Sequence, residues 1–142
     1  MTIEAILQTK SADVTAVPRT TTVAEAARLL AEKRIGAVPV LDGDAVAGIF
    51  SERDVIHALA AQGAAALDNP VGDVMTAPAI TVSRDEAVLG ALSLMTRRRI
   101  RHLPVVEGGR MIGFISIGDL VKYRIDRIEA DAEAMRSYIQ SA

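Results

Sequence analysis

The chain has 142 residues, half of them apolar but only 3% aromatic, with a formal net charge of -2 and no cysteine. This length buries one sizeable core, so we expect one compact unit or two small interlocked halves rather than a multidomain enzyme. The weak acidic charge and the scarce aromatics argue against nucleic-acid binding, and the lack of cysteine removes disulfides and Cys-based zinc sites.

The N-terminus does not resemble a targeting signal. The sequence MTIEAILQTK contains Glu4 and lacks the apolar region of a signal peptide. The apolar stretch from Val55 to Leu67 is too short for a membrane span and includes His57 and Gln62. We therefore expect a soluble, cytoplasmic protein with no membrane partner.

The chain contains an internal duplication. A shift of 65 residues aligns Val17 with Val82 and Pro39 with Pro104. The same shift places the heptapeptide GIFSERD on GFISIGD. The duplication divides the chain into a segment 1–14 that joins the pair, repeat 1 at 15–62, a connection at 63–76, repeat 2 at 77–124 and a helical extension at 125–142.

Each repeat predicts the same order of elements. An extended segment leads to an amphipathic helix, then to two hairpin strands joined at Asp-Gly or Gly-Gly, and finally to a second helix. Thr22 and Glu25 predict a capping box for the first helix of repeat 1, whereas Ser83 or Asp85 is expected to cap its counterpart. The expected ranges are 15–17, 23–34, 37–41 and 46–50 in repeat 1, and 80–82, 88–99, 102–106 and 111–115 in repeat 2.

Pro39 and Pro104 fall inside the first hairpin strand of each repeat. Proline lacks the N–H group that a strand donates, so a sheet tolerates it at an edge or a bulge. We therefore expect the chain beside both prolines to be open to a cleft.

Each heptapeptide places a serine and an aspartate where a strand turns into a helix: Ser51 and Asp54 in repeat 1, Ser116 and Asp119 in repeat 2. The unpaired N–H groups and the positive dipole end of a helix favour a phosphate or a ribose hydroxyl at such a junction. The same residues also fit an S-x-x-D capping box, which binds nothing. A single copy leaves both interpretations open.

The C-terminal stretch 119–140 contains no glycine or proline and predicts one long helix. Its length would be about 33 Å, more than a body of this size needs to cover. We expect a homodimer through this helix, and the alternative is a helix that folds back on its own body. Its apolar residues recur in steps of four and three, the pattern of an a/d seam: Val121, Ile125, Ile128, Ala132, Met135 and Ile139.

Together these residues resemble a tandem pair of CBS domains, named for cystathionine β-synthase, over nearly the whole chain. The resemblance rests on the segments TVAEAARLLAEKRIGAVPV, GIFSERD, VGDVMTAPAITV, LMTRRRIRHLPV and GFISIGDLVK, in order and at constant spacing. It is greatest for small stand-alone bacterial proteins made of one CBS pair and a C-terminal helix. It implies an α+β fold in which two pseudo-twofold-related β-α-β-β-α units pack sheet to sheet and leave two clefts.

In this family the clefts commonly hold an adenosine-containing ligand, such as AMP, ADP, ATP, NAD or S-adenosylmethionine. The resemblance implies that Asp54 and Asp119 meet the ribose hydroxyls and that Ser51 and Ser116 lie near the phosphate. The adenine would lie beside the strands that contain Pro39 and Pro104. That assigns Ile35, Gly36 and Ala37 to one cleft and Ile100, Arg101 and His102 to the other.

The two clefts are not expected to be equivalent. Arg101 and His102 stand where repeat 1 has glycine and alanine, and Arg53 of repeat 1 corresponds to Gly118. Because an arginine can fork onto a phosphate, one site should be tighter, although the residues do not say which. The adjacent arginines fit either a solvated helix end or a phosphate contact: Arg97, Arg98 and Arg99.

We therefore expect a non-enzymatic, energy-sensing regulatory module that binds an adenine nucleotide and alters the dimer or its C-terminal helices. It would have no required cofactor, no catalytic residue and no metal site. The alternative is a protein-interaction module with empty clefts and an output through the C-terminal helix. Catalysis is not expected, because the chain lacks a nucleophilic cysteine and is too short for a catalytic barrel.

Overall fold

The computed structural model describes residues 1–10 and 13–141 and contains the predicted helices and hairpins of both repeats. Repeat 1 contains β1 (Val17–Pro18), α2 (Val23–Lys33), β2 (Ala37–Asp42), β3 (Ala45–Ser51) and α3 (Glu52–Gln62). Repeat 2 contains α5 (Val88–Arg98), β4 (His102–Glu107), β5 (Arg110–Ser116) and α6 (Ile117–Ser141). Outside these lie α1 (Ile3–Thr9), the 3-10 helix η1 (Gly63–Asp68) and α4 (Val71–Val74).

The two hairpins have the same register, which confirms the predicted pair of related α+β units. Strands β2 and β3 run antiparallel with Ala37 opposite Ser51, and β4 and β5 do the same with His102 opposite Ser116. The first strand of repeat 1 has only a single bridge at Val82 as its counterpart in repeat 2. Each hairpin therefore brings the start of its first strand beside the strand-to-helix junction of its heptapeptide.

The first helix of repeat 2 begins at Val88 as predicted, but its cap differs from the prediction. The expected cap of α2 is present, but the residue that precedes α5 is Ala87, so the prediction that Ser83 or Asp85 caps this helix is wrong. The N–H group of Val88 instead donates to the carbonyl of Met1, at 3.2 Å. The equivalent N–H group in repeat 1, that of Val23, donates in the same way to the carbonyl of Asn69, at 2.8 Å. What α5 lacks is the side-chain cap that Thr22 provides for the N–H of Glu25 in α2.

Two hydrophobic cores form, one in each repeat, and each includes a segment from outside its repeat. Helix α1 precedes repeat 1 in the sequence, but its Ile3 and Ile6 share a core with Leu103 of repeat 2. Helix α4 precedes repeat 2, but its Val71 shares a core with Phe50 of repeat 1. Each segment therefore packs against the repeat that it does not directly precede in the sequence.

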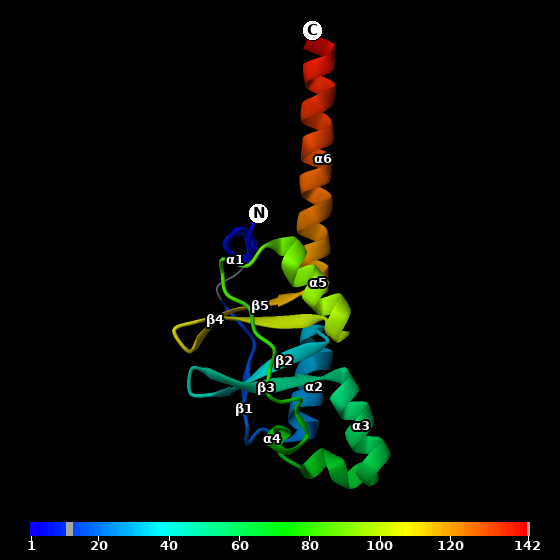
Figure 1. Ribbon diagram of the computed structural model, residues 1–142. Helices are drawn as coiled ribbons and strands as arrows, with labels where there is room; N and C mark the ends of the chain where they lie inside the picture. Colours follow the sequence, from blue (N-terminus) through cyan, green and yellow to red (C-terminus); the bar gives the residue numbers. More distant parts are fainter. Residues whose placement is uncertain (11–12, 142) are drawn as a thin grey trace.

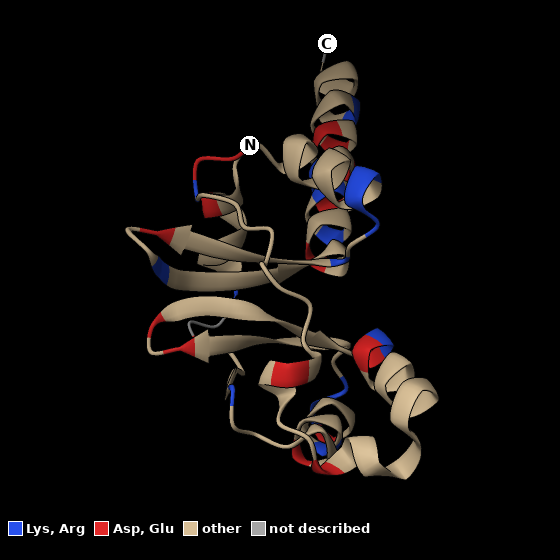
Figure 2. Ribbon diagram, turned by 60° about the horizontal axis from the view of Figure 1, so that its bottom comes forward, with Lys and Arg blue, Asp and Glu red and all other residues tan. Residues whose placement is uncertain are grey.

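The two hairpins stack on each other at the centre of the molecule. Figure 1 shows β4 and β5 above β2 and β3, and Figure 2 shows the same two layers with their turns on one side. The N–H group of Met111 donates to the carbonyl of Asp44 across this contact, at 3.0 Å. Arg110 and Asp44 add an exposed ion pair of 3.4 Å. The stacking leaves the strand-to-helix junctions of both repeats facing the boundary between them.

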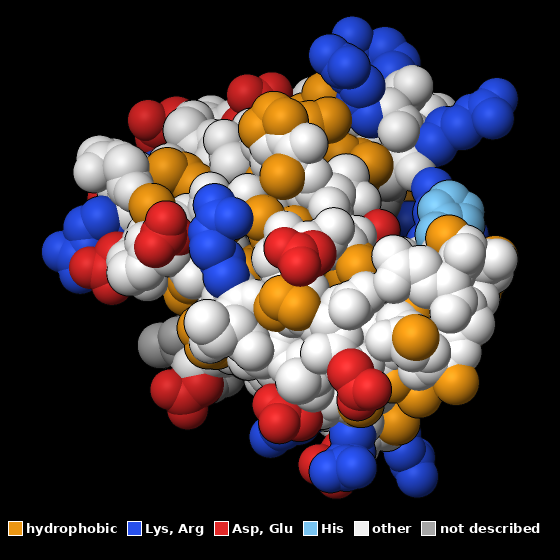
Figure 3. Space-filling model, turned by 90° about the horizontal axis from the view of Figure 1, so that it is seen from below, with side chains coloured by type: hydrophobic (Ala, Val, Ile, Leu, Met, Phe, Trp, Pro, Cys, Tyr) orange, Lys and Arg blue, Asp and Glu red, His pale blue; other side chains and the backbone are white. Residues whose placement is uncertain are grey.

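Helix α6 begins at the body and then projects well beyond it (Figure 1), so it does not fold back on its own chain. No helix in residues 1–10 and 13–141 combines the length and the apolar character that a bilayer crossing needs. On the face seen in Figure 3, several Lys and Arg side chains gather at the upper right, and over the rest of the face basic side chains lie among acidic and apolar ones.

Candidate functional site

Two clefts lie at the boundary between the repeats. One has a volume of about 550 Å³ and the other of about 450 Å³, both within the size range of sites for small molecules. We name them the Asp119 cleft and the Arg53 cleft. The predicted site residues that line the first are Ile35, Gly36, Ala37, His102, Ser116 and Asp119. Those that line the second are Gly36, Ser51, Arg53, Ile100, Arg101 and His102.

Each cleft combines the two repeats. The Asp119 cleft joins the heptapeptide of repeat 2 to the start of β2 in repeat 1, and the Arg53 cleft joins the heptapeptide of repeat 1 to the start of β4. Within each hairpin, the junction is held to the start of the first strand by a backbone bond: Glu52 N–H to Gly36 O at 3.0 Å, and Ile117 N–H to Arg101 O at 2.8 Å. Stacking the hairpins then places each junction opposite the other repeat.

The carboxylate of Asp119 lies at the surface of its cleft, with 27% of the side chain exposed. Its Oδ2 accepts hydrogen bonds from the backbone N–H of Ser116, at 2.8 Å, and from Lys10 Nζ, at 2.6 Å. Burial would raise the pKa of Asp119, but the bonds from Lys10 and Ser116 outweigh it and hold the pKa below its usual value. Asp119 is therefore an ionised acceptor at neutral pH.

The carboxylate of Asp54 is buried instead, with 8% of the residue exposed, and it does not line the Arg53 cleft. Its Oδ2 accepts from the N–H and the hydroxyl of Ser51, at 2.9 and 3.2 Å. Its Oδ1 accepts from the hydroxyl of Thr76, at 3.0 Å. Both oxygens are thus engaged inside the protein. The reciprocal bonds of Ser51 and Asp54 form a capping box, and Ser116 and Asp119 form the same box in repeat 2. Burial and the bond from Thr76 are what set Asp54 apart.

The other predicted site residues fall outside the clefts. Pro39 and Pro104 are buried in the middle of β2 and β4, one residue before the register shift of each hairpin, and line neither cleft. A bulge beside the proline explains why the strand tolerates it without an opening. Arg99 lines the Arg53 cleft, whereas Arg97 and Arg98 do not, so the arginine run divides between cleft and solvent.

Sequence reasoning missed several polar residues of the site, among them Lys10, Glu52 and Thr76. Lys10 donates to Asp119, Glu52 lines the Arg53 cleft, and Thr76 covers Asp54. Lys10 and Thr76 follow α1 and α4, the two segments whose packing is exchanged between the repeats. Their roles depend on that exchange, which nothing in the local pattern signals.

His102 lies between the two clefts and lines both of them. Its ring stacks on Phe114, with the centroids 5.5 Å apart and the planes at 11°. Burial lowers the pKa of His102; Arg101 and Lys10 lower it further, while Asp119 and Glu52 act in the opposite direction. The imidazole is therefore neutral at neutral pH, in contact with both sites.

We predict that His102 makes the folded protein less stable in mild acid. Because the folded pKa lies below the ordinary value of 6.5, the neutral form is favoured, and its contribution is complete above pH 6.5. The contribution is lost as the pH falls from 6.5 through the folded pKa. Urea unfolding across this range should show a steeper decline in the parent than in His102→Phe, which keeps the stacked ring. Equal slopes would contradict this assignment.

The comparisons with known proteins agree with this architecture. The model of the CBS domain matches residues 3–61 and 71–126. The chain is 37% identical over 124 residues to the CBS domain-containing protein CBSX3, mitochondrial, of Arabidopsis thaliana. That match covers 84% of this chain and 60% of the relative, so the chain spans less than two thirds of the plant protein.

Two solved structures extend the comparison to the fold. A CBS-domain-containing protein from Agrobacterium tumefaciens is 42% identical, with a TM-score of 0.82 over 87% of this chain and 92% of that one. A CBS domain pair solved in complex with 5′-methylthioadenosine and S-adenosyl-L-methionine is 24% identical, with a TM-score of 0.77 over 89% of this chain and 98% of that one. Both repeats match the same family model in tandem, and the chain belongs to the CBS-domain family as a pair of CBS domains.

Proposed function

We propose that this chain is a non-enzymatic regulatory module that binds an adenosine-containing nucleotide in the Asp119 cleft and signals through the arrangement of a dimer. The observation that carries the proposal is the contrast between the two heptapeptide carboxylates. Asp119 is ionised and lines a cleft, whereas Asp54 is buried with both oxygens bonded inside the protein. Of the two, Asp119 is the one able to accept the hydroxyls of a ribose.

The ribose would bind at the free side of the Asp119 carboxylate. Among the residues that the structure describes, the hydrogen bonds to this group end on Oδ2, so Oδ1 can accept a ribose hydroxyl. The Ser116 hydroxyl accepts from the N–H of Asp119, at 3.2 Å, and can donate its own hydrogen to a phosphate oxygen. The positive end of the α6 dipole favours an anion at the same place.

The base would lie against the start of β2. Ile35 and Ala37 line the same cleft and offer an apolar wall, and Gly36 leaves its backbone accessible. Lys10 lines the same cleft beside Asp119 and offers a positive charge to a phosphate. The 5′-methylthioadenosine and S-adenosyl-L-methionine in a solved pair of the same fold support a ligand with an adenosine end.

The Arg53 cleft would be the weaker site for the same ligand. Its mouth carries Arg53, Arg99 and Arg101, which attract phosphate, but its Asp54 is withdrawn beneath Thr76. A nucleotide there would gain charge pairs at the surface but would lack a carboxylate that accepts the ribose hydroxyls. We therefore infer one tight site per chain, in the Asp119 cleft.

Calorimetric titration of the purified chain with AMP, ADP, ATP, NAD and S-adenosylmethionine tests this function. We expect micromolar binding of at least one of them, with one site per chain. If none of these compounds gives a binding heat at millimolar concentration, the proposal of an adenosine ligand is rejected. The alternative of an interaction module with empty clefts is then favoured. The exposed apolar face of α6 is the specific observation that supports the alternative.

A further inference from the structure

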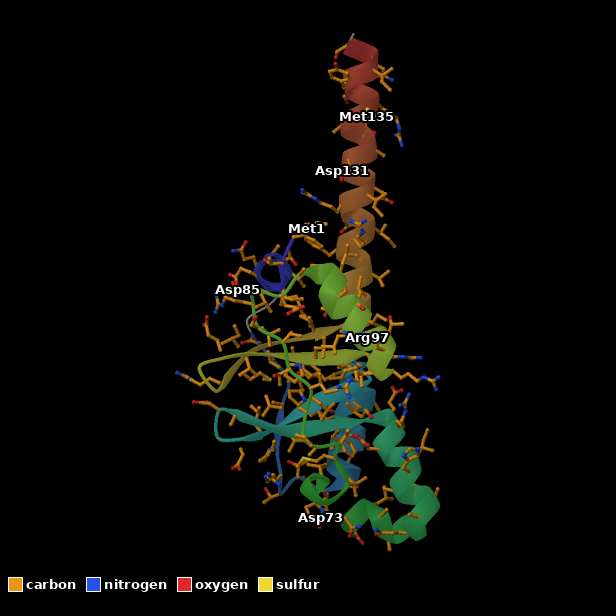
Figure 4. All side chains as sticks on the ribbon, in the orientation of Figure 1. Met1, Asp73, Asp85, Arg97, Asp131 and Met135 are labelled. Carbon is orange, nitrogen blue, oxygen red and sulfur yellow. The ribbon has the colours of Figure 1, made fainter. Side chains whose placement is uncertain are left out.

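The C-terminal helix exposes a line of apolar side chains that its own chain leaves uncovered. Met135 and Ile139 are 60% and 65% exposed, and Val121 at the start of the line is already 43% exposed. Figure 4 shows Met135 and Asp131 on the part of α6 that has left the body. We call this line the α6 seam: Val121, Ile125, Ile128, Ala132, Met135 and Ile139.

The α6 seam faces away from the body. Leu120 is fully buried in the core of repeat 2, and Tyr123 packs against the same core. In a heptad with Ile125 at a and Ile128 at d, Leu120 occupies position c and Tyr123 position f. Both therefore lie on the side of the helix opposite the seam. The seam runs from residue 121 to residue 139, about 27 Å along the helix. Its large side chains are between 43% and 65% exposed, so a second helix can pack against them.

The charges that flank the seam select a parallel partner. In a parallel pair, each g residue meets the next e residue of the other helix, five positions along. Arg124 would meet the partner's Glu129, and Asp131 would meet the partner's Arg136. Both contacts join opposite charges, and twofold symmetry makes each of them twice.

An antiparallel pair in which every seam residue is matched would be repelled. There g residues meet g residues and e residues meet e residues. Asp131 would face the partner's Asp131, Glu129 the partner's Glu129, and Lys122 the partner's Arg136. Sliding the antiparallel helices by one heptad relieves the repulsion but leaves two seam residues of each helix uncovered, either Met135 and Ile139 or Val121 and Ile125.

We propose that a second copy of this chain covers the α6 seam, as a parallel, in-register, two-stranded coiled coil with Arg124–Glu129 and Asp131–Arg136 ion pairs between the helices. The inference rests on the dimer of the proposed function, to which it adds the surface, the orientation and the register. It is independent of which ligand the clefts hold.

The mass of the full chain in solution is the first test. Sedimentation equilibrium of the parent should give twice the mass of one chain, and Ile128→Asp should give the mass of one chain. Ile128 is 52% exposed, so the substitution leaves the cores of the protomer intact. Ala130→Asp, which puts the same charge at position f of the same turn, is the matched control and should remain dimeric. A monomeric parent, or an Ile128→Asp variant that stays dimeric, overturns the proposal.

Cross-linking is the second test and fixes the orientation. Because the chain has no cysteine, Met135→Cys carries a single thiol. In the parallel coiled coil this thiol faces its own copy, and oxidation should give a disulfide-linked dimer, whereas Ala130→Cys should not cross-link. In the fully matched antiparallel pair, position 135 faces 125 and lies about 15 Å from its own copy. Cross-linking only in a mixture of Met135→Cys and Ile125→Cys would therefore overturn the parallel orientation.

Both tests are made without nucleotide, which keeps the two proposals separable. A parent that binds no nucleotide would reject the ligand of the Asp119 cleft and leave the mass and the cross-links unchanged. A parent that binds nucleotide as a monomer would reject the coiled coil and leave the ligand proposal intact.

Discussion

Replacement of Asp119 by alanine should weaken binding of the preferred nucleotide by roughly 10- to 100-fold, the usual loss for a charge-assisted hydrogen bond of about 1.5–3 kcal/mol. The substitution removes the acceptor for the ribose and leaves Lys10 without its 2.6 Å partner in the cleft. Because Asp119 is partly exposed, the fold should survive, and unfolding of the variant by urea would verify this. Titration calorimetry with the nucleotide that the parent binds best gives the change in affinity.

Asp54→Ala is the matched control for that experiment, because the duplication makes it the equivalent residue. Asp54 lies inside the protein and accepts from Ser51 and Thr76, so its removal should lower stability and leave affinity for the Asp119 cleft within a few-fold of the parent. Equal losses of affinity in the two variants, or a loss confined to Asp54→Ala, would contradict the assignment of the tight site to Asp119.

Gly48→Ala should lower the free energy of unfolding by about 1–3 kcal/mol, which is typical of a close-packed site that receives an extra methyl group. A Cβ at Gly48 would lie 2.7 Å from the carbonyl oxygen of Thr76. That oxygen is fixed, since it accepts from the N–H of Ile49 at 2.9 Å while the N–H of Thr76 donates back to Ile49. The clash is with backbone, so the relief would require displacement of the segment that covers Asp54.

Gly113→Ala tests the same explanation at the equivalent glycine of the second heptapeptide. Its Cβ would lie 2.5 Å from Leu7 Cδ2, which is the end of a flexible side chain and can rotate away. For that reason we expect the free energy of unfolding to fall by less than about 1 kcal/mol, measured again by urea unfolding. If Gly113→Ala lowers the free energy of unfolding as much as Gly48→Ala does, the difference between a backbone neighbour and a side-chain neighbour does not explain the destabilisation.

The parts of the fold that could be predicted from the sequence are those encoded locally and twice. The apolar periods and the Gly-containing turns predict the helices and hairpins closely, because each of these signals lies within a few residues. The shift that aligns Val17 with Val82 then shows that the same elements occur twice. The start of α5 at Val88 was predicted correctly but its cap was not, since Ala87 precedes it and the N–H of Val88 is bonded to Met1, far away in the sequence. Contacts at that separation leave no local pattern.

The same distinction applies to the candidate site. The heptapeptides locate Asp54 and Asp119 at strand-to-helix junctions, but they do not distinguish the buried carboxylate from the accessible one. The difference is made by Thr76 in one repeat and Lys10 in the other, and the Lys10–Asp119 contact joins residues 109 positions apart. The apolar seam of α6 also leaves open whether two copies of this helix pair in parallel or antiparallel. The charges at Arg124 and Asp131 favour the parallel pair.

The exchange of α1 and α4 means that the two repeats cannot be separated by a single cut. Severing the chain after Thr76 would leave repeat 1 with α4 and a complete core, but repeat 2 without Ile3 and Ile6, which are 0% and 2% exposed in its core. Removal of α1 would accordingly destabilise repeat 2 and leave the core of repeat 1 complete. The N-terminal helix thus completes the core of the C-terminal repeat. The Asp119 cleft therefore depends on residues from both the N-terminal segment and repeat 2.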